Sequence, residues 1–111
     1  MDNRLPAHLE ISGIIRAVQS QGGFATVLAK GERGGGTILL LMVEHGKNDR
    51  LYERMSQLDG SREFVLTKEQ DASKPGEMAE YLDRRTRQDP DIWILELDIP
   101  NAERFAAVQH K

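Results

Sequence analysis

The stretch Ile38-Leu39-Leu40-Leu41-Met42-Val43, residues 38–43, decides the fold of this chain. All of its side chains are apolar, and no polar residue interrupts them. A short apolar run without alternation is typical of a strand that is covered on both faces, and such a strand lies inside a sheet. The segment from Ile92 to Leu97 has the same character in its first part. We therefore expect two central strands.

Further segments around residues 38–43 also have strand character. From Leu51 to Ser56 the side chains alternate with a period of two, which marks a strand with one solvated face. Phe24 to Lys30 and Arg62 to Thr67 are short segments with apolar centres, bounded by turn residues. Successive strands joined by short turns predict an antiparallel meander. The turns are Gly31–Gly36, His45–Asp49 and Asp59–Gly60.

Two segments have the spacing of amphipathic helices. Between Pro6 and Gln21, apolar residues recur at i, i+3, i+4 and i+7, which places them on one helical face. A second helix is expected from about Pro75 to Gln88, because Pro90 disfavours the helical conformation of the residue before it. The apolar positions are Ile11, Ile14, Ile15 and Val18 in the first segment and Met78, Tyr81 and Leu82 in the second.

These elements predict a single α+β domain over residues 1–111, in the order α-β-β-β-β-α-β. We expect two layers: a four-strand antiparallel meander plus a fifth strand, with both helices packed on one face of the sheet. The fifth strand arrives through a helix, which favours parallel pairing with a neighbour. The doubly apolar strands also need cover on their second face. A short helix from Asn101 carrying Phe105, or a second subunit, would supply that cover.

Composition excludes several classes of function. The chain has no cysteine, so it has no disulfide, no thiolate metal site and no cysteine nucleophile. Its net charge is −3, which disfavours a general nucleic-acid-binding surface. The N-terminus shows no signal-peptide pattern, and no apolar run is long enough to span a bilayer. We expect a cytoplasmic protein without membrane contact.

The most distinctive motif is Asp89-Pro90-Asp91-Ile92-Trp93-Ile94-Leu95-Glu96. Together with Ile14-Ile15-Arg16, Phe24-Ala25 and Lys30-Gly31, it resembles a family of short alpha-proteobacterial proteins that is catalogued as domain of unknown function fourteen-ninety-one. The resemblance extends from about Leu5 to Phe105, and the chain departs from the family pattern between Met55 and Ser73. It implies a bacterial cytoplasmic protein with no assigned activity, and it carries no catalytic or binding residues over to this chain.

Asp89, Asp91 and Glu96, followed by Asp98, form an acidic set. Carboxylate oxygens suit Mg²⁺ or Mn²⁺, and a metal-assisted phosphodiesterase or phosphate-binding enzyme would use them. Nuclease cores of the restriction type need a lysine two residues after the second acid, where this chain has Asp98. Structural roles also explain these acids, since Asp89 closes a helix and Asp91 opens a strand.

A basic cluster lies at the end of the second predicted helix. Arginine forks recognise phosphate or carboxylate groups. The alternative is a solvated helix end, whose cations complement the helix dipole and pair with Glu80 and Asp83. The cluster consists of Arg84, Arg85 and Arg87, and Arg16 and Lys30 are candidates to extend it.

Other features carry little chemistry. The glycine-rich segment 31–36 precedes a strand and not a helix, so we interpret it as a flexible hairpin turn and not as a phosphate loop. His8, His45 and His110 lack metal-ligand spacing, and no serine lies in a G-x-S-x-G motif.

The sequence therefore favours a non-enzymatic module that binds a protein partner or a second copy of itself through a sheet face or edge. The candidate binding surface comprises the three arginines of the basic cluster with Asp89, Asp91 and Glu96. We expect no metal and no cofactor. The metal-assisted enzyme that uses the acidic set is the alternative.

Overall fold

The computed structural model describes residues 6–56 and 58–100 of the chain. Its helices and strands follow the predicted order α-β-β-β-β-α-β, which confirms the α+β class. The short helix expected from Asn101 lies outside the described residues. The elements are α1 (Ala7–Ser20), β1 (Phe24–Ala29), β2 (Ile38–Glu44), β3 (Lys47–Ser56), β4 (Arg62–Glu69), α2 (Glu77–Gln88) and β5 (Trp93–Asp98).

β5 lies inside the sheet, between β1 and β2. Within the described residues the strand order is β1-β5-β2-β3-β4. β5 runs parallel to β2, as its arrival through a helix predicts, and antiparallel to β1. The meander comprises β2, β3 and β4, whereas β1, expected beside β2, is separated from it by β5. Burial explains why β5 takes the position beside β2. A strand that is apolar on both faces is most stable in the interior of a sheet, with a neighbour on either side.

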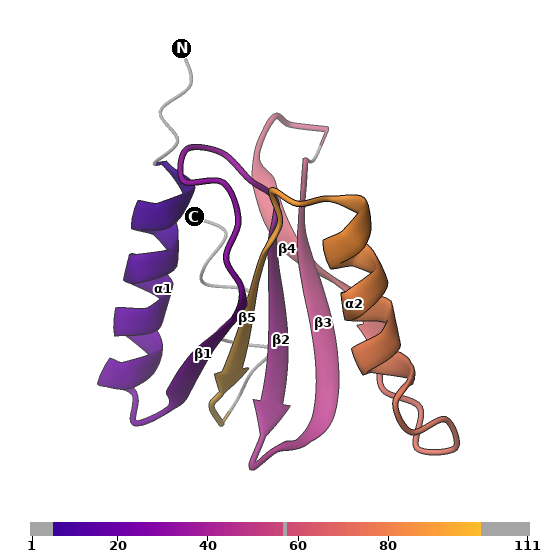
Figure 1. The fold of residues 1–111 in the computed structure, drawn as a ribbon. Helices are drawn as coiled ribbons and strands as arrows, with labels where there is room; N and C mark the ends of the chain where they lie inside the picture. Colours follow the sequence, from indigo (N-terminus) through magenta and orange to yellow (C-terminus); the bar gives the residue numbers. More distant parts are fainter. Residues whose placement is uncertain (1–5, 57, 101–111) are drawn as a thin grey trace.

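The two helices lie on opposite faces of the sheet (Figure 1). α1 packs Ile11, Ile14 and Val18 on one face, and α2 packs Met78 and Leu82 on the other. The prediction that both helices pack on one face is wrong. An amphipathic stripe shows that a helix is packed, but it does not specify against which face of the sheet. α2 thus supplies the cover that the second face of the central strands requires. Neither described helix is long and apolar enough to cross a membrane.

The two predicted central strands are neighbours at the centre of the sheet. Leu39 and Leu40 of β2, and Leu95 of β5, are fully buried. Because successive side chains of a strand point to opposite faces, Leu40 and Leu95 join the apolar cluster under α1, while Leu39 and Ile94 join the cluster under α2. Both apolar clusters are therefore built on the same pair of strands.

The glycine-rich segment 31–36 carries the chain past the start of β5, from β1 to β2. It is not a hairpin turn, because β1 and β2 are not neighbours. The backbone N–H of Glu32 donates to the carbonyl of Asp91 (3.1 Å), and the indole N–H of Trp93 donates to the carbonyl of Glu32 (2.7 Å). A Cβ atom at Gly36 would collide with the carbonyl oxygen of Asp91. The glycines therefore permit a close backbone crossing.

The same segment completes the first turn of α1. The N–H groups of Ala7 and His8 donate to the carbonyls of Gly34 (3.2 Å) and Arg33 (2.9 Å). The first N–H groups of a helix have no partner within the helix, so these carbonyls take the place of a side-chain cap. The N–H groups at the start of α1 are thus bound to carbonyls of the segment 31–36.

Candidate functional site

Arg85 is part of the contact between α2 and the sheet. Its Nη1 donates to Glu53 Oε1 on β3 and to the hydroxyl of Tyr81, both at 2.8 Å. The two charged side chains are largely buried, at 24% exposed for Arg85 and 12% for Glu53. Burial alone would lower the pKa of Arg85, but the hydrogen bonds that it donates to Glu53 and Tyr81 outweigh this effect and raise the pKa. Arg85 is therefore committed to holding the helix in place.

Arg84 and Arg87 extend toward solvent. The Arg84 guanidinium lies 5.7 Å from the centre of the Tyr81 ring, a cation–π distance. Arg87 pairs with Asp83 at 3.1 Å, and both side chains are about 70% exposed (72% and 68%). An exposed pair of this kind contributes little to stability. These two arginines, unlike Arg85, present cationic surface.

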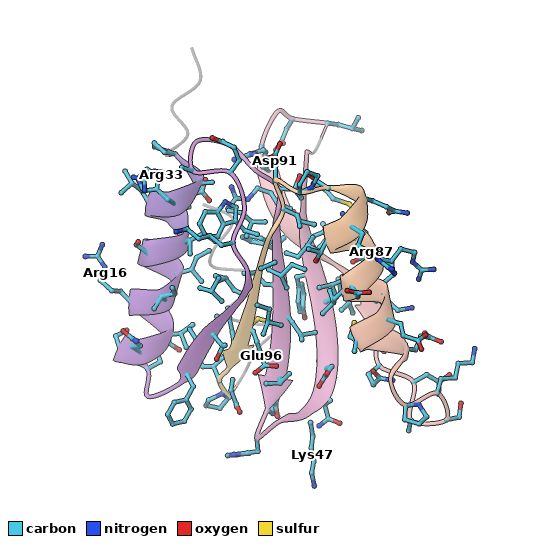
Figure 2. The ribbon with its side chains drawn as sticks, viewed as in Figure 1. Arg16, Arg33, Lys47, Arg87, Asp91 and Glu96 are labelled. Carbon is cyan, nitrogen blue, oxygen red and sulfur yellow. The ribbon has the colours of Figure 1, made fainter. Side chains whose placement is uncertain are left out.

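The predicted extension of the basic cluster is wrong for Arg16. Figure 2 shows Arg16 on α1 and Arg87 on α2 pointing away from opposite sides of the molecule. A cation that the fold does bring to α2 is Lys68 of β4, whose Nζ lies 5.2 Å from the centre of the Tyr81 ring and 2.9 Å from Glu77. Sequence patterns did not indicate Lys68, because its approach to Tyr81 depends on which face of the sheet α2 covers.

The acidic residues are separated in space. Asp89 ends α2 and accepts the N–H of Asp91 at 3.0 Å, so its carboxylate stabilises the turn into β5. Figure 2 shows Asp91 at the start of β5 and Glu96 toward its other end. Among the described residues, no three histidine, cysteine or acidic side chains are grouped so that they could hold a metal ion. The convergence that a metal-assisted enzyme requires is not present in this part of the chain.

The exposed edge of β1 is a surface that the sequence patterns did not single out. No strand of the described chain pairs with its outer side. Its six residues, Phe24–Ala29, carry no charge. Phe24 is 74% exposed, and Val27 and Leu28 are 43% and 47% exposed. In the sequence, the only sign of this surface is the uncharged run Phe24–Ala29 after two glycines. Such a run does not distinguish an edge strand from an interior strand unless the sheet order is known.

Two carboxylates lie beside this edge, on β5. Glu96 pairs directly with Thr26, and Asp98 with Phe24. Strand alternation places Glu96 and Asp98 on the face opposite α1, because Leu95 and Leu97 pack in the α1 cluster. Both are half-buried. Asp98 Oδ1 accepts the N–H of His45 at 2.9 Å, and Glu96 has neither a hydrogen-bond donor nor a cation as a partner in the structure described.

Comparison with known proteins places the chain in a family. A search of curated proteins finds no match. The crystal structure of a DUF1491 family protein from Caulobacter crescentus is 27% identical, with a TM-score of 0.79 over 92% of this chain and 94% of that chain. The solution structure of a protein from A. tumefaciens is 26% identical, with a TM-score of 0.75 over 94% and 93%.

The family model described as "Protein of unknown function (DUF1491)" matches residues 5–107, which is nearly the whole chain. The match confirms the resemblance carried by the motif around Trp93, and both structural relatives come from alpha-proteobacteria. The chain therefore belongs to the DUF1491 family, whose function is not known.

Proposed function

We propose that this chain is a non-enzymatic protein-interaction module, and that the edge of β1 binds an extended segment of a partner protein. The observation that carries the proposal is the exposed, uncharged edge formed by Phe24–Ala29. A free edge presents a row of backbone donors and acceptors, and proteins normally block such an edge with charges. Addition of a partner strand pairs these groups, while side chains such as Phe24 and Leu28 supply apolar contact.

The partner can be another protein or a second copy of this chain. The second face of the central strands does not require a second subunit, because α2 covers it. Self-association would therefore occur through β1. A strand edge that pairs with a partner strand can also pair with its own copy across a two-fold axis.

Two matched variants test the proposal. Val27 on β1 and Leu66 on β4 are similarly exposed, at 43% and 39%, and both belong to the outer strands of the sheet. Val27→Lys adds a charge to the free edge, whereas Leu66→Lys adds one to an edge that is already charged. In affinity capture from the native cell, we expect the wild type and Leu66→Lys to retain the same partner and Val27→Lys to lose it.

Circular dichroism checks that both variants fold. If Val27→Lys is folded and captures the same partner as the wild type, β1 is not the binding edge. A metal-assisted enzyme makes a different prediction, because Mn²⁺ that binds only the folded state raises the melting temperature. We expect Mn²⁺ to leave the melting temperature unchanged, and a rise that Glu96→Gln abolishes would favour the enzyme.

A further inference from the structure

The β1 edge is apolar along the strand but acidic beside it. Within Phe24–Ala29 the exposed large side chains are apolar. One strand inward, on the face opposite α1, Glu96 lies next to Thr26 and Asp98 lies next to Phe24. A strand added outside β1 would therefore meet apolar groups first and two carboxylates behind them.

Among the described residues, neither of these carboxylates has a cation as a partner. On the inner side of β5, the residues paired with Glu96 and Asp98 are Leu41 and Val43, which are buried and apolar. In the described part of the chain Glu96 has no polar partner, and Asp98 accepts only a backbone N–H. A half-buried carboxylate gains more from an opposite charge than one in open water, because solvent screens the pair less.

Geometry allows a partner to supply the cation. A strand outside β1 would lie two strand spacings, about 10 Å, from β5. Thr26 stands between them with a short side chain, so the long stem of an arginine or lysine opposite Thr26 can extend across it toward Glu96. Apolar residues two positions away on the partner strand would then face Phe24 and the end of β1, because side chains alternate.

We infer that the partner segment is an extended strand with a basic residue at its centre and apolar residues two positions to either side. This inference rests on the proposed binding edge. A second copy of β1 does not fit it, because Phe24–Ala29 contains no lysine or arginine and the nearest cation, Lys30, lies beyond the end of the strand. Charge complementarity therefore favours a different protein over a second copy.

The test uses two synthetic peptides of about nine residues, the length of an ordinary strand. Both are acetylated and amidated, with isoleucine two positions to either side of the centre and threonine elsewhere. One has arginine at the centre and the other has glutamate. Titration into the isotope-labelled full chain is followed by NMR, which reports both affinity and the residues that shift.

We expect the arginine peptide to shift the amides of Phe24–Ala29 and to bind at least about five-fold more tightly than the glutamate peptide, the factor of one partly exposed ion pair. Glu96→Gln, which keeps the size of the side chain, should remove most of this preference. Glu80→Gln on the exposed surface of α2 controls for the change in net charge and should leave it intact.

The outcomes separate this inference from the proposed function. Equal binding of both peptides at β1, or an arginine preference that survives in Glu96→Gln, overturns the basic partner but leaves the binding edge in place. Binding of neither peptide at millimolar concentration overturns the basic partner, and the capture experiment with Val27→Lys then decides on the edge. Sedimentation that shows a dimer broken by Val27→Lys would make a second copy the occupant and overturn the inference.

Discussion

The two edges of the sheet are built in opposite ways. β4 carries four charged residues, and two of them tie it to the helices: Arg62 lies 3.7 Å from Glu10 of α1, and Lys68 lies 2.9 Å from Glu77 of α2. β1 carries no charge and exposes apolar side chains. Charges on an edge strand prevent unwanted pairing, so within the described residues the β4 edge is protected and the β1 edge is open. This contrast is the observation on which the proposed binding edge rests.

The largest expected effect comes from breaking the crossing that places β1 outside β5. In Gly36→Ala, the new Cβ would meet the carbonyl oxygen of Asp91, which is backbone and cannot rotate away. We expect a loss of about 3 kcal/mol in the free energy of unfolding, as for an overpacked interior. Urea denaturation measures it.

Gly35→Ala is the matched control for that substitution. It lies in the same segment, and a Cβ there has nothing within 4 Å. Its effect should stay within about 0.5 kcal/mol. Equal losses in the two variants would show that the segment depends on glycine flexibility and not on the close approach to Asp91.

A second, smaller effect is expected on the β4 side. Arg85→Gln removes the charge that pairs with Glu53, and Glu53 is only 12% exposed. Among the described residues, the hydroxyl of Thr67, which donates to Glu53 at 2.8 Å, then remains as its hydrogen-bond partner. Breaking a largely buried pair strands one charge, so we expect a loss of about 2 kcal/mol.

Arg87→Gln controls for the loss of one arginine from the same helix. Because Arg87 and its partner Asp83 are both exposed, the variant should lose less than about 0.5 kcal/mol. Thermal denaturation of the two variants side by side gives the comparison. A loss in Arg87→Gln as large as that in Arg85→Gln would contradict the division of the basic cluster into a structural arginine and surface arginines.

Much of the fold could be predicted from local patterns. The apolar runs at Ile38–Val43 and Ile92–Leu97 identified the central strands because a strand buried on both faces has no polar period. The position of β1 could not be predicted in the same way. Its place outside β5 depends on the glycine crossing against Asp91, a contact between segments about sixty residues apart.

The candidate site was predicted less well, for a related reason. Arg85 was identified by its place at a helix end, but its partner Glu53 lies 32 residues away, and no local pattern connects them. Glu96 was identified as an acid, and only the strand order shows that it lies beside a free edge. Residue types suggested the chemistry, whereas sheet order decided which residues share a surface.

A third test gives β1 the feature that protects β4. Val27→Lys places a charge on the open edge, where it should slow aggregation of concentrated or heated protein, because a charged edge resists pairing with other chains. Leu66→Lys adds the same charge to β4, which already has charged neighbours, and should change the rate little. Light scattering at fixed protein concentration measures the aggregation rate of each variant. Equal slowing by the two variants would show that net charge, and not the edge, controls association.

The smallest expected effect is a loss of stability at low pH, and it should be larger on the β4 side of the sheet than on the β1 side. Hydrogen bonds from Ser61 lower the pKa of Asp59, those from Ser73 lower the pKa of Asp71, and Lys68 lowers the pKa of Glu77. A carboxylate whose pKa is lower in the folded state stabilises the fold above its unfolded pKa, and this contribution is lost as pH falls through the folded pKa. Stability should therefore decrease below about pH 4.5.

These three carboxylates belong to the β3–β4 turn, to the loop after β4 and to α2, so acid should loosen the β4 side first. Asp49 acts in the opposite direction, because burial raises its pKa and its protonation favours the folded state, but it is one group against three. Hydrogen exchange at pH 3.5 and pH 6 should show reduced protection in β4 and α2 with little change in β1. Glu77→Gln removes the carboxylate that pairs with Lys68 and should therefore make the β4 side less sensitive to acid. If β1 loses protection from hydrogen exchange before β4 and α2 do, these carboxylates do not control the stability of the β4 side.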